Sequence, residues 1–173
     1  MAKWYVLQVT TDREIEIKNR IEKQGYKVLV PLVEKIIRQK GKWKRQIDII
    51  FRGYIFVKLD YKWSDYYSLC KCPGVIRLLG GGKNPIPLTD EEIMTVRRHL
   101  FNLFQARILY FHVEFDNEGK LIPLNGILKE FKDQLISYKR RQRRAVIELT
   151  IAKNKTPVTV SFIEKQKQLY AEG

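Results

Sequence analysis

The sequence predicts an α+β protein: an amino-terminal α/β sandwich, built from a mixed sheet with helices, followed by a small carboxy-terminal β-barrel. Strand and helix signals alternate as β-α-β-β-α-β-α over the first part of the chain. After residue 104 this pattern is lost, and two strand-like segments dominate the end of the chain. We therefore expect domains at residues 1–105 and 119–173, joined by a linker at residues 106–118.

The first strand and helix are predicted from residue types and spacing. Residues 3–9 (KWYVLQV) are rich in aromatic and β-branched side chains, which favours a strand. Thr11 is followed three residues later by Glu14, the signature of a capping box at the start of a helix. Ile17 and Ile21 then lie one turn apart on the same helix face.

A hairpin with a basic tip is predicted next. Residues 28–37 form a strand-like segment in which Pro31 indicates an edge or a bulge. Residues 38–45 contain five basic residues and no acidic one, with Gly41 near the centre and strand-like sequence on both sides. This arrangement predicts a β-hairpin with a cationic tip.

The rest of the first domain is predicted to add two strands and two helices. Residues 54–60 and 75–79 are strand-like, and residues 63–69 form a short helix. A second capping box, Thr89 with Glu92, precedes the clearest helix of the chain. Apolar residues spaced by three and four form one face of that helix: Ile93, Val96, Leu100, Leu103 and Phe104.

The second domain is predicted to be mostly β. Residues 145–151 and 157–163 form a hairpin joined through Asn154 and Lys155. Residues 128, 131 and 135 also show helical spacing, so a helix remains an alternative there. About 50 residues is close to the lower limit for independent folding.

Charge is the strongest global feature of the chain. Its 173 residues include 33 Lys and Arg against 19 Asp and Glu, a formal net charge of +14. A protein this basic typically binds a polyanion, and nucleic acid is the first candidate. No apolar run approaches the roughly 20 residues that span a bilayer, and no signal-peptide pattern is present. We expect a cytoplasmic protein without a membrane partner.

Nothing in the sequence indicates catalysis. The Gly80–Lys83 stretch lacks the spacing of a phosphate-binding loop and leads into Asn-Pro, which favours a flexible loop. Cys70 and Cys72 are too few for a structural zinc site and are interpreted as reduced thiols. We therefore expect a protein that is not an enzyme and that carries no cofactor and no metal.

Two features favour binding instead. In residues 51–59 (FRGYIFVKL), alternation places Ile55 and Val57 on one face and Tyr54 and Phe56 on the other. With few helices available to cover both faces, we expect an exposed aromatic patch, although a fully buried strand is the alternative. Trp43, within the basic run, could stack on a base or fold back onto the sheet. The second basic run, residues 139–144, is interpreted either as a binding segment or as a solvated turn.

Five short motifs, in order, resemble the NusG family of bacterial transcription elongation factors. These are WYVLQ at residues 4–8, the V-x-x-P element at 28–31, FRGYIFV at 51–57, PGV at 73–75 and PLTDEE at 87–92. Arg52 stands where the family usually has Pro. Residues 123–126, 139–146 and 157–163 are similar to a degenerate KOW barrel. Among specialised paralogues, the basic hairpin and the KRRQRRA stretch resemble the LoaP antiterminators.

The resemblance implies a NusG-type first domain, a KOW-type second domain and a monomer that acts by binding. The aromatic patch would contact the clamp region of RNA polymerase, and by position it comprises Tyr5, Phe51, Tyr54 and Phe56. Holding the clamp closed would suppress pausing or termination. The second domain could contact the ribosome or the termination factor Rho.

We expect the first domain to bind a structured hairpin in nascent RNA. The first-choice contacts are Arg38, Lys40, Lys42, Lys44 and Arg45 for phosphates, with Trp43 among them to stack on a base, and the second-choice contacts are Arg52, Arg77, Lys83, Arg97 and Arg98. Two alternatives remain: a housekeeping NusG-type elongation factor without RNA specificity, or a ribosome-associated KOW protein that binds ribosomal RNA.

Overall fold

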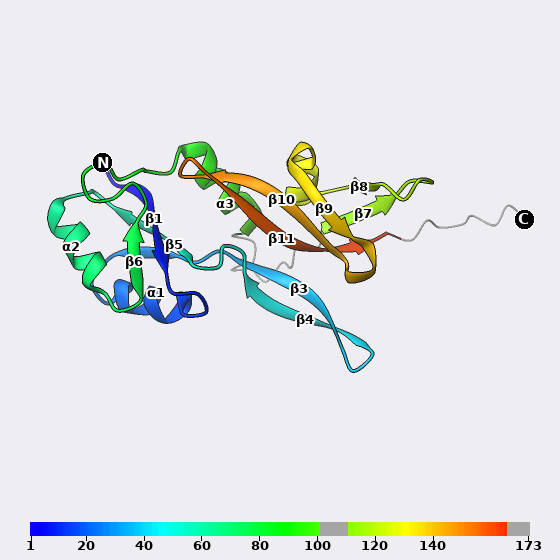
Figure 1. Cartoon of the computed structure of the whole chain (residues 1–173), viewed down its shortest axis with the longest axis horizontal. Coiled ribbons are helices and arrows are strands. Elements are labelled where there is room, and N and C mark those ends of the chain that lie inside the picture. Colours follow the sequence, from blue (N-terminus) through cyan, green and yellow to red (C-terminus); the bar gives the residue numbers. More distant parts are fainter. Residues whose placement is uncertain (101–110, 166–173) are drawn as a thin grey trace, which may run out of the picture.

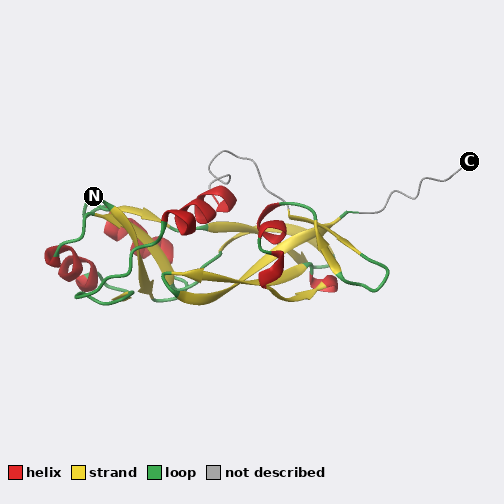
Figure 2. Cartoon of the chain, turned by 90° about the horizontal axis from the view of Figure 1, so that it is seen from above, coloured by secondary structure: helices red, strands yellow, loops and turns green. Residues whose placement is uncertain are grey.

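The computed structural model describes residues 1–100 and 111–165. We call these segments the first half and the second half. They lie next to each other along the long axis of an elongated molecule, as two views at right angles show (Figures 1 and 2). The residues predicted at 103 and 104 to complete a helix face lie outside the described residues.

The first half is built on a four-stranded antiparallel sheet. Its strands are β1 (Lys3–Val9), β2 (Lys27–Leu29), β5 (Tyr54–Leu59) and β6 (Val75–Leu78), in the order β2-β5-β1-β6. Every neighbouring pair is antiparallel, so the expected mixed sheet is wrong for this half. The reason is that β5 lies between β1 and β2, and the helical connection from β1 to β2 therefore skips a strand.

Two helices cover one face of this sheet. They are α1 (Glu14–Glu22) and α2 (Trp63–Lys71), and α1 buries Ile17 and Ile21 completely. The predicted capping box at Thr11 is wrong, because Asp12 has a positive φ of 68° and the helix begins only at Glu14. The buried Glu14 carboxylate instead accepts a hydrogen bond from the backbone N–H of Gly53 at 2.7 Å.

The other face of the sheet packs against α3 (Asp90–Leu100) and the second half. The predicted capping box of α3 is confirmed: Thr89 Oγ1 accepts from the Glu92 N–H at 3.1 Å, and Glu92 Oε2 accepts from the Thr89 N–H at 2.8 Å. Ile93 and Val96 are buried as expected. Apolar residues of both halves form one continuous cluster, so the core crosses from one half to the other.

The basic hairpin leaves the first half and runs along the second. It consists of β3 (Leu32–Gln39) and β4 (Lys42–Ile49), and Pro31 separates β3 from β2. Lys40 and Gly41 have φ values of 50° and 76°, as the two central residues of a type I′ turn require. β3 contacts β11 of the second half, and Figure 1 shows the tip projecting away from the body of the molecule below that sheet. The predicted hairpin is therefore confirmed.

The second half is a five-stranded sheet with short helices. Its strands are β7 (Phe111–Phe115), β8 (Leu121–Pro123), β9 (Leu135–Lys139), β10 (Arg144–Ile151) and β11 (Asn154–Glu164), in the order β8-β7-β11-β10-β9. The β11–β7 pair is parallel and the others are antiparallel. The short helices are α4 (Gly126–Glu130), η2 (Lys132–Gln134) and η3 (Arg140–Gln142).

Two details of the second half differ from expectation. Strand β7 lies inside the stretch predicted as a linker and pairs with β8 and β11, so most of the described part of that stretch belongs to the second sheet. The β10–β11 turn lies at Ala152 and Lys153, with φ values of 48° and 64°, rather than at Asn154 and Lys155. Within the described residues, β8 and β9 do not pair to close a barrel.

Among residues 1–100 and 111–165, none of the helices combines the length and the apolar composition of a membrane-spanning segment.

Candidate functional site

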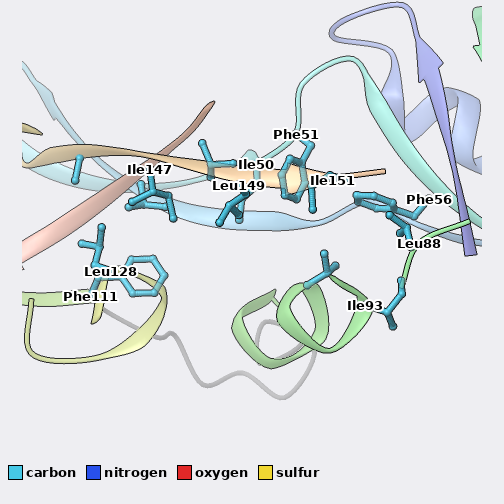
Figure 3. Packing of buried hydrophobic residues seen from close by; sticks show 14 of the residues in the cluster. Ile50, Phe51, Phe56, Leu88, Ile93, Phe111, Leu128, Ile147, Leu149 and Ile151 are labelled. Carbon is cyan, nitrogen blue, oxygen red and sulfur yellow. The ribbon is translucent and has the colours of Figure 1, made fainter. Parts of the chain in front are cut away.

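The aromatic patch is covered by the second half. Phe51 and Phe56 meet edge to face, with their ring centroids 5.6 Å apart, and are only 3% and 0% exposed. Ile151, at the end of β10, lies against them (Figure 3). Tyr54 is half-buried and lines a small cavity together with Phe51 and Phe56 on one side and Asn154 and Thr156 on the other. The expected exposed patch is therefore wrong for this arrangement of the two halves.

The physical reason is that the second half brings its own apolar surface. Leu149 and Ile151 of β10 are buried in the same cluster as Phe56. The prediction of an exposed aromatic patch considers only the helices of the first half as elements that could cover this face of the sheet. The predicted alternation of β5 is nevertheless confirmed: Ile55 and Val57 face α1 and α2, whereas Phe56 faces the second half.

Tyr5 lies on the opposite side of the sheet from the rest of the patch. It pairs across the sheet with Val57, and its ring contacts Tyr61 at 5.8 Å between centroids. Burial, with the nearby Asp60 carboxylate, raises the pKa of Tyr5. Trp4 and Val6 share the side of Phe56 instead. Residues directly opposite each other in an antiparallel pair point to the same side of the sheet, and Val6 lies opposite Phe56. Trp4, two residues before Val6, is therefore on the side of Phe56, and the β1–β5 register identifies it as a member of the patch.

A hydrogen bond joins the second half to the start of α3. The backbone N–H of Ala152, in the β10–β11 turn, donates to Glu92 Oε1 at 3.0 Å. Ala152 is almost fully buried, so this N–H has no access to water while the halves are packed. The Glu92 carboxylate therefore joins the start of α3 to the turn of the second half.

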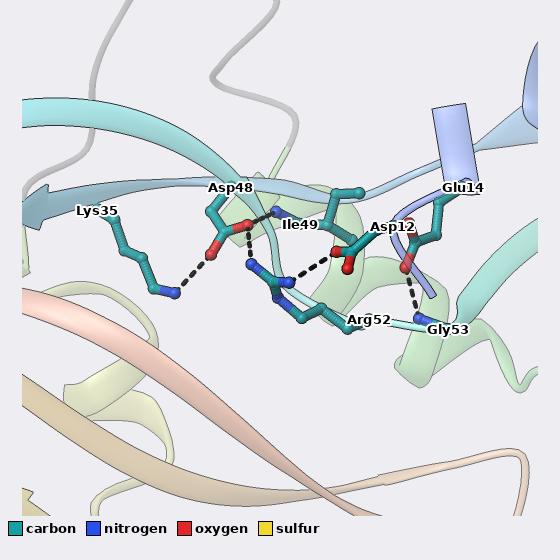
Figure 4. A network of polar contacts seen from close by, with 7 residues as sticks. All are labelled: Asp12, Glu14, Lys35, Asp48, Ile49, Arg52 and Gly53. Carbon is teal, nitrogen blue, oxygen red and sulfur yellow. Dashed lines mark hydrogen bonds and ion pairs between the residues drawn. The ribbon is translucent and has the colours of Figure 1, made fainter. Parts of the chain in front are cut away.

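A network of ion pairs holds the base of the basic hairpin (Figure 4). Arg52 donates to Asp12 at 2.8 Å and to Asp48 at 2.9 Å, and Lys35 also pairs with Asp48. Burial would by itself raise the pKa of Asp48, but hydrogen bonds from Lys35, Arg52 and the Ile49 N–H hold it below its usual value. The guanidinium of Arg52, a second-choice RNA contact, is thus already paired with two carboxylates.

Arg52 is followed by a glycine that the turn requires. Gly53 has a φ of 80°, and a Cβ at this position would lie 3.3 Å from Thr11 Oγ1. The turn aims the Gly53 N–H at Glu14 and its carbonyl at the N–H of Val9. It therefore connects the ion-pair network to the aromatic patch.

Next to this network lies a cavity of about 340 Å³ between the hairpin base and β11. Lys35, Arg52 and Lys155 line it with Asp48, Pro157 and Thr159. Its lining draws on both halves, so it exists only while they are packed together.

The first-choice RNA contacts lie together on the exposed end of the basic hairpin. All six side chains of that set are solvent-exposed. Arg38 and Trp43 are directly opposite each other, with the guanidinium carbon 6.0 Å from the indole centroid. Cationic side chains on a projecting two-stranded element can reach the backbone of a nucleic acid.

The second-choice contacts are dispersed. Arg77 lies on β6, at the sheet edge opposite β2, and donates to Gln8 Oε1 at 2.8 Å. Lys83 is exposed in the loop that follows β6. The side chains of Arg97 and Arg98 lie outside the described part of the chain. None of the described members of this set is brought to the hairpin tip.

The second basic run meets the basic hairpin, which sequence reasoning missed. The guanidinium carbon of Arg143 lies 4.3 Å from the centroid of the Trp43 ring. Arg140 pairs with Glu164 and covers the ring of Phe115, also at 4.3 Å. The sequence signal was the similar composition of the two runs, but nothing local indicates that they are neighbours in space.

The described residues offer little for covalent or metal chemistry. They contain no group of three or more His, Cys, Asp or Glu side chains placed to hold a metal ion. Burial raises the pKa of the Cys72 thiol, which reduces its thiolate fraction. The surfaces described above are suited to binding.

An antiparallel sheet with helices, packed against a second, β-rich half, is an architecture shared with a solved structure. That structure is described as "Domain interaction in Thermotoga maritima NusG". It matches with a TM-score of 0.58 and covers 93% of this chain and 94% of the other. The sequences are 22% identical, so the likeness establishes the fold.

Sequence comparisons identify the family. Residues 2–97 match the family described as "Transcription termination factor nusG". The transcription termination/antitermination protein NusG of Campylobacter jejuni is 25% identical over 180 residues, covering 95% of this chain and 97% of that protein. Its namesake in Chlamydia trachomatis is 30% identical over 152 residues, covering 75% and 79%. This chain therefore belongs to the NusG family of transcription termination/antitermination factors.

Proposed function

We propose that this protein is a cytoplasmic antitermination and elongation factor that binds RNA polymerase and a hairpin in nascent RNA, promoting processive transcription of specific operons. One observation carries this proposal: a single NusG-family chain holds two chemically different surfaces. One is the aromatic patch, which is apolar, and the other is the basic hairpin. The resemblance to the LoaP antiterminators supports the same assignment.

The aromatic patch is the proposed contact for the clamp region of RNA polymerase. We assign it to Phe51, Tyr54 and Phe56, with Trp4 in place of Tyr5 because Trp4 lies on the same side of the sheet. A contiguous apolar surface of this kind is suited to a protein partner. Because β10 and β11 cover it here, polymerase binding requires the two halves to separate. The proposed mechanism needs no covalent chemistry, since a factor that binds across the cleft of RNA polymerase keeps the polymerase clamp closed.

The basic hairpin is the proposed contact for RNA. Lysine and arginine side chains bind phosphates and release counterions, so affinity should fall with salt. The type I′ turn presents these side chains on a two-stranded element whose base is fixed by the Asp48 network.

One experiment with two variants of the full chain separates the two surfaces. We expect Tyr54→Ala to weaken polymerase capture and antitermination while sparing RNA binding, because Tyr54 lies at the edge of the aromatic patch. Lys42→Ala/Lys44→Ala should weaken binding of a stem-loop RNA and lower the salt slope by about 0.9 for each phosphate that the variant no longer binds. The measurements are polymerase pull-down and RNA titration at several salt concentrations.

Matched controls remove similar groups elsewhere. Tyr67→Ala removes an exposed aromatic side chain of α2, and Lys23→Ala/Lys27→Ala removes two exposed charges, one just after α1 and one at the start of β2. An unchanged RNA affinity and salt slope in the hairpin variant would refute RNA binding by the hairpin and leave a housekeeping NusG-type factor. Polymerase capture that is insensitive to Tyr54→Ala would favour a ribosome-associated RNA-binding protein.

A further inference from the structure

The two densest basic segments of the chain meet in the folded protein. The basic hairpin comes from the first half, and the run at residues 139–144 lies at η3 and the start of β10 in the second half. The stacking of Arg143 on Trp43 joins them, and β3 contacts β11 over the adjoining stretch. Segments that are distant in sequence thus form one basic surface.

Much of the positive charge on this surface is not neutralised. Lys42 and Lys44 of the hairpin and Lys139 and Arg141 of the second run are exposed. Within the described part of the chain, no ion pair involves any of these four side chains. Like charges held close together repel one another, and an anionic partner that bridges them would relieve that repulsion.

The state of Trp43 indicates which anionic partner fits. Proteins that bind single-stranded RNA use aromatic side chains as platforms on which bases stack. Arg143 already lies over the ring of Trp43, and Arg38 lies at 6.0 Å. Because the Arg143 guanidinium covers one face of this ring, less of it is available for stacking, and the surface is better suited to phosphates than to unpaired bases. Paired RNA is recognised mostly by shape and by its sugar-phosphate backbone.

We propose that residues 139–144 and the basic hairpin form a single surface for the backbone of a paired RNA stem, with the Arg143–Trp43 stack holding the two parts together. This inference rests on the RNA-binding role proposed above and extends it to the second half. It also requires that the halves remain packed while the stem is bound.

The test is a titration of the full chain with two fluorescent RNAs. One is a GC-rich stem-loop, and the other is a poly(U) strand of the same length that remains single-stranded. We expect Lys139→Ala/Arg141→Ala to weaken stem-loop binding several-fold and to lower the salt slope by about 0.9 for each phosphate left unbound. The control, Lys129→Ala/Lys132→Ala, removes two exposed charges from α4 and η2 and should bind the stem-loop as the unchanged protein does.

The outcomes separate this inference from the function on which it rests. If Lys42→Ala/Lys44→Ala weakens stem-loop binding and Lys139→Ala/Arg141→Ala does not, the hairpin alone binds RNA and the composite surface is refuted. If neither variant has an effect, RNA binding by the basic hairpin and by residues 139–144 is refuted, and the proposed RNA-binding role of the hairpin fails with it. Equal affinity of the unchanged protein for the stem-loop and for poly(U), with the same response to each variant, would overturn the preference for paired RNA.

Discussion

Glu92 uses its two carboxyl oxygens for two different contacts. Oε2 accepts from the Thr89 N–H and completes the capping box of α3, whereas Oε1 accepts from the Ala152 N–H of the second half. The capping box could be predicted from the spacing of Thr89 and Glu92. The contact with Ala152 could not, because its partner is distant in sequence and is a backbone group.

At this residue, Glu92→Gln should loosen the contact between the halves. A glutamine side chain has one carbonyl oxygen, so its NH₂ group would face one of the two N–H donors that the carboxylate now satisfies. We expect the free energy of unfolding to fall by about 1–2 kcal/mol, measured by urea denaturation. Glu91→Gln alters an exposed neighbour and should have little effect. If both variants were destabilised equally, the Glu92–Ala152 contact would contribute nothing specific.

The β3–β4 hairpin illustrates which features of an element are encoded locally. Its turn follows from Lys40-Gly41, its cationic tip follows from composition, and the break at Pro31 follows from the missing N–H of proline. The direction in which the hairpin leaves the first half depends on Asp48, which forms ion pairs with both Lys35 and Arg52. Acidic and basic residues are common in this sequence, so spacing alone could not show which of them pair.

The pH dependence of this element follows from Asp48. The folded-state pKa of Asp48 lies below its unfolded-state value, so the ionised carboxylate stabilises the folded protein. This contribution is fully present above the unfolded pKa of about 4 and is lost as pH falls through the folded value. We expect Asp48→Asn to lower the urea midpoint at pH 7 and to approach the unchanged protein in acid. A constant difference at every pH would contradict this account, and Asp133→Asn, an exposed carboxyl in η2, is the control.

At the scale of the whole molecule, the sequence predicted the parts better than their packing. The alternation in β5 predicts that Tyr54 and Phe56 share one face, as observed, but it does not indicate that the second half covers that face. The sheet order and the assignment of β7 to the second sheet depend on strand pairing between distant segments, which residue spacing does not encode. The meeting of Trp43 with Arg143 is a non-local contact of the same kind.

Packing of the halves gives the two proposed surfaces opposite requirements. The basic surface is complete only when the halves are together, whereas the aromatic patch is accessible only when they are apart. A ligand that binds one arrangement stabilises it, and the coupling between two such ligands is reciprocal. A paired RNA stem should therefore favour the packed arrangement, and a partner at the aromatic patch should favour the separated one.

The most direct test is hydrogen exchange at the Ala152 amide, with and without stem-loop RNA. This N–H donates across the interface to Glu92, so its exchange rate reports how often the halves separate. If the stem binds only the packed arrangement, exchange should slow with RNA concentration, by up to about 100-fold at 100 times the dissociation constant. Faster exchange on adding RNA would contradict the account, because it would show that RNA binds the separated halves.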